Sequence, residues 1–381
     1  MLINRPFQKL KRLDWLLTLT MVLLAVGSVA FIYSASYRGP GQAMPDYYRM
    51  QIVWFGIGLV LYIMATVIDY RQICQWATVW YVLAVGLLVV VLIAGTKVYG
   101  ARRWLGWGGF GIQPSEVAKL AVLIAIAYYL FHRPPAMTRT WATIGGAIAI
   151  GVVPLLLIFA QPDLGSAVIL TLVVLVMLFA AGVRMKHLVL VTLFGISLGV
   201  VGLPLMWKMK ENRTGKKSYQ KERLMVFLDP NRDPLGAGWN LNQSLIAVGS
   251  GGLTGKGYLQ GTQNLLGYLP RTVAPNDFLF SVIAEEKGFA GSVCVIGLFA
   301  VVLFRGLRIA AEARDRLGML LATGIVALLF FHVFVNIGMT IGLLPVKGLP
   351  LPLLSYGGSF VLATMTALGL LQNVWIHRKN Y

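Results

Sequence analysis

Long apolar stretches recur along the whole chain, and they limit the fold more than any other feature of the sequence. Hydrophobic residues make up 57% of the chain and charged residues 12%, with a mean hydropathy of +0.74. Each stretch is near the ~20 residues that a helix needs to cross a hydrocarbon core of about 30 Å. Ten spans are predicted, at about 14–35, 51–68, 74–95, 116–131, 140–160, 165–182, 187–207, 277–304, 317–341 and 355–376.

Backbone groups in lipid must form hydrogen bonds within their own segment, so these spans are expected to be helices. The predicted fold class is therefore an all-α polytopic membrane protein with about ten transmembrane helices. We expect one membrane domain over residues 1–381, with a long loop at about 208–276 between the seventh and eighth helices.

The basic residues of the short loops predict the orientation of the chain. Fifteen Lys and Arg fall on one side, whereas the short loops of the other side hold six: Arg38, Arg49, Lys97, Arg102, Arg103 and Lys347. Cytoplasmic loops carry the excess of basic residues, so both termini are expected in the cytoplasm and the long loop outside. The net charge of +19 is scattered over many loops rather than gathered in one patch, which argues against a nucleic-acid partner.

Polar residues concentrate first in the segment GARRWLGWGGFGIQPSEVAKL, residues 100–120. Pro114 suits the first turn of a helix, and the helix dipole favours a carboxylate at Glu116. Glu116 and Lys119 are three residues apart, so they share a helix face and can form an ion pair. The pair is either a local feature of the helix start or a functional pair at the outer membrane boundary.

The segment QPDLGSA, residues 161–167, places Asp163 at a tight break between two apolar spans. Asp is a common N-cap, so capping of the following helix is the default interpretation. Asp163 can also serve function if this break faces a cavity, and the spacing alone does not decide between the two.

The long loop has a basic first half and a glycine-rich second half. Lys208 to Arg223 could attract an anionic lipid headgroup or a pyrophosphate, or could be an ordinary solvated loop. The second half, GSGGLTGKGYLQGTQ, surrounds Lys256 and ends at Gln263. Glycines let a backbone approach a ligand and present its N–H groups to anionic oxygens. The spacing is not that of a Walker motif, so by itself this is a weak signal.

Two further segments bring ionisable and polar groups to the ends of apolar spans. The segment NDFLFSVIAEEKG carries Asp277, Glu285 and Glu286 into the eighth span, where ionisable groups are costly and are retained mainly for function. The segment GLLPVKGLPLPLLSYGGSF, residues 342–360, is broken by prolines and paired glycines, with Ser355 and Tyr356 as its polar groups. Such a break is typical of a segment that lines a cavity, in enzymes and transporters alike.

The order of these motifs resembles the SEDS family (shape, elongation, division and sporulation) over essentially the whole chain. The motifs are RRW and QPSEVAKL, QPDLGSA, FLDP with DPLGAG, QSLIAVGSGGLTGKG, GTQ, NDFLFSVIAEEKG and LPLPLLSYGGS. The DPLGAG and GKGxxxGTQ elements are more similar to the elongation members of the family than to the division members.

The resemblance implies a peptidoglycan glycosyltransferase that polymerises lipid II into a growing glycan strand outside the bacterial cytoplasmic membrane. It also implies a class B penicillin-binding protein as transpeptidase partner. Asp277 matches the essential aspartate of the family's (T/N)DF(I/L)F motif, and Glu116, Lys119 and Asp163 match other positions linked to function. One departure stands out: the family usually has Glu after the Leu-Pro of this region, where this chain has Arg271.

The chemistry that the resemblance implies needs a base for the acceptor hydroxyl, and a partly desolvated carboxylate such as Asp277 suits that role. Basic groups should stabilise the lipid pyrophosphate that leaves, with Arg102, Arg223 and Lys256 as candidates and Gln263 and Ser355 as supporting polar groups. An α-linked donor and a β-1,4 product imply inversion in one displacement, so one base suffices. The sequence leaves open whether a divalent cation, Mg or Mn, assists.

Two other functions fit part of the same pattern. A flippase or transporter of the same lipid would use broken segments and intramembrane ionisable residues, although no inverted repeat is evident. A non-catalytic scaffold for a penicillin-binding protein would explain the large loop but would leave Asp277 without a role.

Overall fold

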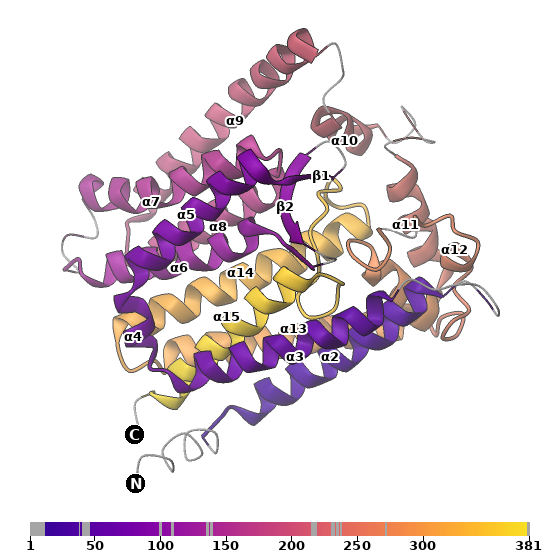
Figure 1. Ribbon diagram of the computed structural model, residues 1–381, viewed down its shortest axis with the longest axis horizontal. Helices are drawn as coiled ribbons and strands as arrows, with labels where there is room; N and C mark the ends of the chain where they lie inside the picture. The colour runs from indigo at the N-terminus through magenta and orange to yellow at the C-terminus, as the bar shows by residue number, and fades with distance from the viewer. Residues whose placement is uncertain are drawn as a thin grey trace.

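The computed structural model describes residues 12–37, 39, 46–98, 101–107, 110–134, 137, 140–214, 219–229, 233, 236, 238–270 and 273–378. Its helices form one bundle of mostly long, antiparallel rods (Figure 1). The helices that lead up to the long loop are α2 (Trp15–Ser36), α3 (Tyr47–Val67), α4 (Tyr70–Gln75), α5 (Ala77–Ala94), α6 (Pro114–Phe131), α7 (Trp141–Ala160), α8 (Leu164–Ala180) and α9 (Met185–Thr214). Those that follow are α10 (Tyr219–Leu228), α11 (Trp239–Ser250), α12 (Thr262–Leu265), α13 (Leu279–Ala311), α14 (Arg316–Thr340) and α15 (Gly358–Ile376).

The predicted fold class is confirmed. Among the described residues, nine helices are long and apolar enough to cross a membrane, and the 17-residue α8 is a shorter apolar helix in the place of the sixth expected span. Helices α6, α14 and α15 are the most buried of these spans and form the centre of the bundle, because their apolar residues cover most of the helix circumference. Helix α9 lies along the upper edge of Figure 1, and few of its described side chains are buried.

Two parts of the fold differ from the sequence expectation. Residues 208–276 are not one irregular loop, because α9 runs on to Thr214 and α10, α11 and α12 follow. A small antiparallel sheet, β1 (Thr96–Val98), β2 (Ala101–Trp107) and β3 (Phe110–Ile112), lies between α5 and α6, where no strand was expected. The glycine-rich alternation of this segment suits tight hairpins, and neighbouring backbone groups pair across it.

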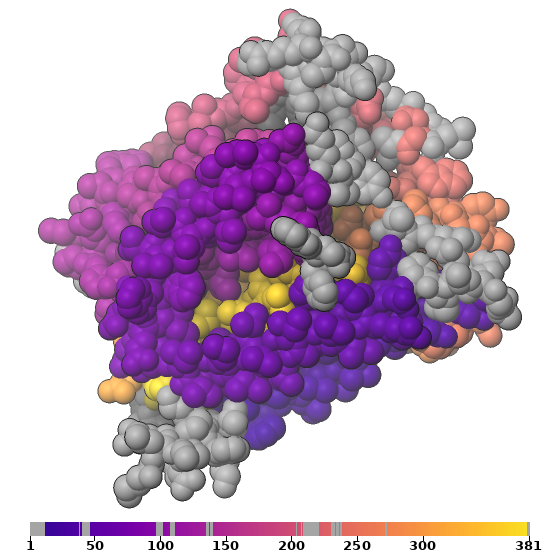
Figure 2. All heavy atoms as spheres, in the orientation of Figure 1, coloured from indigo at the N-terminus to yellow at the C-terminus, as the bar shows by residue number. Residues whose placement is uncertain are grey.

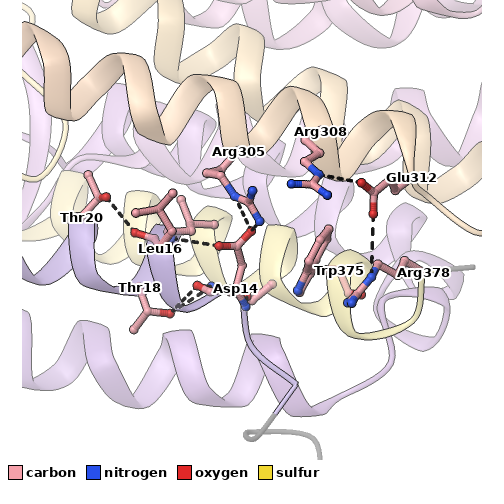
Figure 3. A network of polar contacts seen from close by, with 11 residues as sticks. Asp14, Leu16, Thr18, Thr20, Arg305, Arg308, Glu312, Trp375 and Arg378 are labelled. Atoms are coloured by element: carbon pink, nitrogen blue, oxygen red, sulfur yellow. Dashed lines mark hydrogen bonds and ion pairs between the residues drawn. The ribbon is translucent and has the colours of Figure 1, made fainter. Parts of the chain in front are cut away.

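Polar contacts tie three helices together at the end of the bundle where α2 begins and α15 ends, here called the terminal end (Figure 3). Asp14 caps α2 by accepting from the Leu17 N–H, and its other oxygen accepts from Arg305 of α13 at 2.7 Å. The Arg378 guanidinium lies 3.6 Å from the centre of the Trp375 ring on α15. Capping, a part-buried ion pair and a cation–π contact thus fix the terminal end. The residues of functional interest lie at the opposite end, here called the site end.

A hollow opens on the face of the bundle shown in Figure 2, between the side of α3 and the side of α5. The yellow C-terminal helix α15 forms part of its floor. This helix packs closely along α3, and Gly369 and Gly358 allow the approach, since an added Cβ would meet backbone atoms of Tyr62 and the ring of Trp54.

Candidate functional site

A short turn that leads into α13 positions Asp277. The Asp277 N–H donates to the Val273 carbonyl oxygen at 2.9 Å, and the carbonyl oxygen of Asp277 accepts from the Asn336 side chain of α14 at 3.0 Å. The turn is also held by the Tyr356 N–H, which donates to the Pro275 carbonyl oxygen at 2.9 Å. The Asp277 carboxyl group is therefore fixed by backbone contacts on two sides, at the point where the loop region enters a membrane helix.

Charged groups from three other parts of the chain surround this carboxyl group. Burial raises the pKa of Asp277 from 3.8 to about 6, while the positive charge of Arg223 lowers that pKa, the negative charge of Asp163 raises it and Arg103 lowers it. The Asp277 residue as a whole is half-buried, while protein surrounds its carboxyl group closely enough for burial to be the largest influence on its pKa. A carboxylate with a raised pKa can accept a proton near neutral pH.

The segment between α14 and α15 forms another wall of the site. Gly348 has φ +66°, and a Cβ added there would lie 3.1 Å from Asp277 Oδ2 and 3.8 Å from Arg223 Nη1. Glycine is required here by its backbone conformation and by this close approach. The neighbouring Lys347 has a lowered pKa because it is largely buried and lies close to the Arg223 charge. Arg223 also donates to the Val346 carbonyl oxygen at 3.4 Å.

Arg223 and Arg103 act on the Asp277 carboxyl group, and Lys347 lies close to Arg223; these three residues are here called the cationic wall. They come from α10, β2 and the α14–α15 segment, respectively. Such a set of cations can bind a phosphate or pyrophosphate while the carboxylate beside it accepts a proton.

The expected ion pair between Glu116 and Lys119 is present and lies inside the bundle. Lys119 Nζ lies 2.8 Å from Glu116 Oε2, with 1% and 4% of the two side chains exposed. The same ammonium group lies 2.8 Å from Nε2 of His332 on α14, and the Phe360 ring of α15 packs nearby. Removing one partner of a buried pair typically costs about 3–5 kcal/mol because the other charge is left unpaired, and the contact from Lys119 to His332 links this pair on α6 to α14.

Asp163 serves as the expected N-cap, since one of its oxygens accepts from the Ser166 N–H at 3.1 Å. Its other oxygen accepts from the Gln113 side chain at 3.3 Å. Its negative charge also acts on Asp277 and on the buried Glu116. The N-cap interpretation of Asp163 is therefore confirmed, and its charge acts on Asp277, while a role of Asp163 in function stays a prediction.

Lys256 and Gln263 lie in a different cluster, which is built around Glu285 of α13. Glu285 is about two helical turns, or about 12 Å, beyond Asp277 along the chain. Lys256 Nζ lies 2.6 Å from Glu285 Oε1, which also accepts from the Thr262 hydroxyl group and the Gln263 N–H. Glu286, the neighbour of Glu285, accepts from the Ser34 hydroxyl group of α2. The structure does not bring Lys256 or Gln263 to Asp277.

The glycine-rich loop packs against α13, which corrects the expectation that its N–H groups face a ligand. The Lys256 and Gly257 N–H groups donate to the Glu285 and Glu286 carbonyl oxygens, each at 3.0 Å. These contacts replace the intrahelical bonds lost where Gly288 breaks α13, with φ +64° and ψ −160°. A Cβ on Gly288 would lie 2.4 Å from the Gly255 nitrogen. The loop therefore satisfies the backbone of a broken helix.

Two more sequence candidates have structural partners. Ser355 is fully buried, and its hydroxyl oxygen accepts from the Leu351 N–H at 2.9 Å, so it closes the turn before α15. Arg102 donates to the carbonyl oxygens of Leu92 and Ile93 at the end of α5. The next residue, Arg103, donates instead to the Gln161 and Pro162 carbonyl oxygens beside Asp163.

Sequence reasoning missed Arg103, Lys347, His332 and Asn336 as residues of the site. The RRW and PVKG motifs offered signals for the first two, and the polar His332 and Asn336 inside the apolar span 317–341 were a signal of the same kind as Glu285 and Glu286. Arg271 and residues 215–218 of the basic segment 208–223 lie outside the described residues. Within the described part of the chain there is no group of three or more His, Cys, Asp or Glu that could hold a metal ion, so no residues are assigned to a divalent cation.

Fold and site together define a many-spanning helical membrane protein whose charged site is built from loops at one end of the bundle. A sequence profile of the FtsW, RodA and SpoVE cell cycle proteins matches residues 14–380. The chain belongs to this family, and the resemblance to SEDS proteins is confirmed.

Individual relatives match over nearly their full length. The peptidoglycan glycosyltransferase MrdB of Escherichia coli K12 is 39% identical over 380 residues, which covers 99% of this chain and 97% of the relative. Among solved structures, RodA of Thermus thermophilus is 30% identical with a TM-score of 0.69, covering 97% of this chain and 98% of that one. A chain from a peptidoglycan synthase complex that coordinates polymerization and crosslinking has a TM-score of 0.78 at 32% identity, covering 96% and 98%.

Proposed function

We propose that this protein is a peptidoglycan glycosyltransferase, the activity for which its E. coli relative is named, and that it polymerises lipid II into glycan strands. The observation that carries the proposal is the juxtaposition of Asp277, with its raised pKa of about 6, and the cationic wall of Arg223, Lys347 and Arg103. A proton acceptor beside a pyrophosphate-binding surface is what glycosyl transfer from a lipid pyrophosphate requires.

In the proposed reaction, the acceptor sugar hydroxyl attacks the anomeric carbon of the donor while Asp277 takes the hydroxyl proton. A new carbon–oxygen bond forms as the bond between the anomeric carbon and the pyrophosphate oxygen breaks, with inversion. Negative charge grows on the departing lipid pyrophosphate, where the cationic wall stabilises it. The proton then resides on Asp277 and is released to solvent before the next turnover.

The cellular setting follows from the same proposal. The excess of basic residues in one set of short loops supports cytoplasmic termini and a site end that faces outward from the bacterial cytoplasmic membrane. Lipid II and the growing strand are then the substrates. The structural likeness to a chain of a peptidoglycan synthase complex supports a class B penicillin-binding protein as the partner that crosslinks the product.

The decisive experiment is polymerisation of lipid II by the purified full-length protein with the partner's transpeptidase blocked. Wild type is expected to make glycan chains, whereas Asp277→Asn, which keeps the shape but removes the basic oxygen, is expected to make none. Movement of lipid between leaflets without chain formation would favour the flippase. A folded, partner-bound Asp277→Asn protein that polymerises at the wild-type rate would remove Asp277 from the mechanism.

A further inference from the structure

The Asn336 carboxamide joins the two segments that form the site. This side chain of α14 is fully buried, and its Nδ2 donates to the Asp277 carbonyl oxygen at 3.0 Å and to the Leu349 carbonyl oxygen at 2.6 Å. Leu349 follows Gly348, which lies against the Asp277 carboxylate, and Lys347, which lies close to Arg223. One amide group therefore uses both of its hydrogens to hold the base-bearing turn against the segment that carries a cation of the wall.

The position of α14 is itself fixed one turn away. His332 is four residues before Asn336, so both side chains lie on the same helix face. Its Nε2 lies 2.8 Å from Lys119 Nζ, which in turn pairs with Glu116. All three ionisable side chains are at least nine-tenths buried. This anchor restricts rotation and sliding of α14 against α6, and through Asn336 that restriction extends to Asp277.

We propose that Asn336 is a positioning residue for glycosyl transfer, which sets the separation between the Asp277 carboxylate and the Lys347–Gly348 segment, with His332 and the Glu116–Lys119 pair as its anchor. The inference rests on the proposed function. Because both amide hydrogens are donated to backbone carbonyl groups inside the protein, Asn336 acts through the positions of Asp277 and Lys347 rather than by contact with substrate. A misplacement of about 1 Å between reacting groups can cost on the order of 100-fold in rate.

The test compares Asn336→Ser with Asn373→Ser in the full-length protein. Asn373 of α15 is equally buried, and its Nδ2 donates to the Ala65 and Thr66 carbonyl oxygens at the terminal end. The control therefore removes similar hydrogen bonds from an amide group to backbone carbonyl oxygens, far from the site. Both variants should lose thermal stability. Only Asn336→Ser should lower kcat, by about 10- to 100-fold at unchanged folded fraction, and Asn336→Gln should recover part of the loss.

The pH profile provides a second readout. The charged groups that act on Asp277 are Arg223 of α10, Arg103 of β2 and Asp163 before α8, and Lys347 before α15 lies close to Arg223. A loosened turn admits water to Asp277, so the acidic limb of the Asn336→Ser profile should move to lower pH, whereas Asn373→Ser should keep the wild-type limb. Equal loss of kcat in both variants, with neither limb displaced, would overturn the proposal.

Hydrogen–deuterium exchange separates this inference from the proposed function, because it needs no activity. Residues 273–278 and 345–350 should exchange faster in Asn336→Ser than in wild type, and no faster in Asn373→Ser. Unchanged exchange in both segments would refute the proposed positioning role of Asn336 even if Asp277→Asn is inactive. Faster exchange in a protein that never polymerises lipid II would support the hydrogen bonds of Asn336 as the link between the two segments, and it would refute the proposed glycosyltransferase activity.

Discussion

Replacing Asp277 by Asn should remove activity and stabilise the fold at the same time. The pKa of Asp277 is raised by burial from 3.8 to about 6, against the opposing charges of Arg223 and Arg103. One pKa unit corresponds to about 1.4 kcal/mol of differential interaction, so about two units correspond to roughly 3 kcal/mol. Partial exposure of Asp277 to solvent reduces this value, and we expect about 1–3 kcal/mol.

The direction of this stability change follows from the linkage between proton binding and folding. A carboxyl group with a raised folded-state pKa opposes folding when it is ionised, so its destabilising effect is full above pH 6 and disappears as pH falls toward 4. The carboxamide of the Asp277→Asn variant cannot ionise, and the gain in stability should therefore be largest at about pH 7.5 and small at about pH 4.5. The same pKa predicts that wild-type kcat falls below pH 6, with about a tenth of the base ionised at pH 5.

Thermal denaturation of the purified protein at the two pH values measures this effect. Asp315→Asn is the matched control, for which we expect a stability change in the opposite direction. Burial raises the pKa of Asp315, but hydrogen bonds from the Gly318 N–H, Tyr70 and Arg71 lower it below its ordinary value overall. Asp315→Asn should therefore destabilise the fold at about pH 7.5. An Asp277→Asn protein that melts at or below the wild-type temperature at that pH would refute the argument from burial.

The transmembrane framework was predictable from the sequence because each span satisfies its own backbone and shows its length in hydropathy alone. The helices within 208–276 were not predictable in this way, since they are short and their polar faces give no span signal. The break at Gly288 depends on backbone donors that lie about 30 residues earlier, near Gly255 and Lys256. Such a pairing is set by tertiary packing rather than by local pattern.

The candidate site shows the same division between local and long-range information. Glu116 with Lys119, and the cap at Asp163, follow from spacings within one helix turn, and both contacts are present. The choice between Arg102 and Arg103 required knowledge of the strand β2, because successive strand residues point to opposite faces. The contact between Lys256 and Glu285, which are 29 residues apart, could not be read from local spacing either.

Three further predictions concern the walls of the site. Gly348→Ala should lower kcat by about 10-fold or more, because it strains a left-handed backbone position and places a methyl group 3.1 Å from the Asp277 carboxylate; steady-state polymerisation measures it. Arg103→Gln should reduce the polymerisation rate, whereas Arg102→Gln, which loses only contacts to α5 carbonyl groups, should stay near wild type. Lys347→Met should lower kcat by on the order of 100-fold with a smaller change in KM, because a cation that meets charge developing on the departing pyrophosphate acts mainly in the transition state. Lys347→Arg keeps the positive charge and should recover part of the rate. A Lys347→Met enzyme with raised KM and unchanged kcat would instead make this lysine a binding group for the intact substrate.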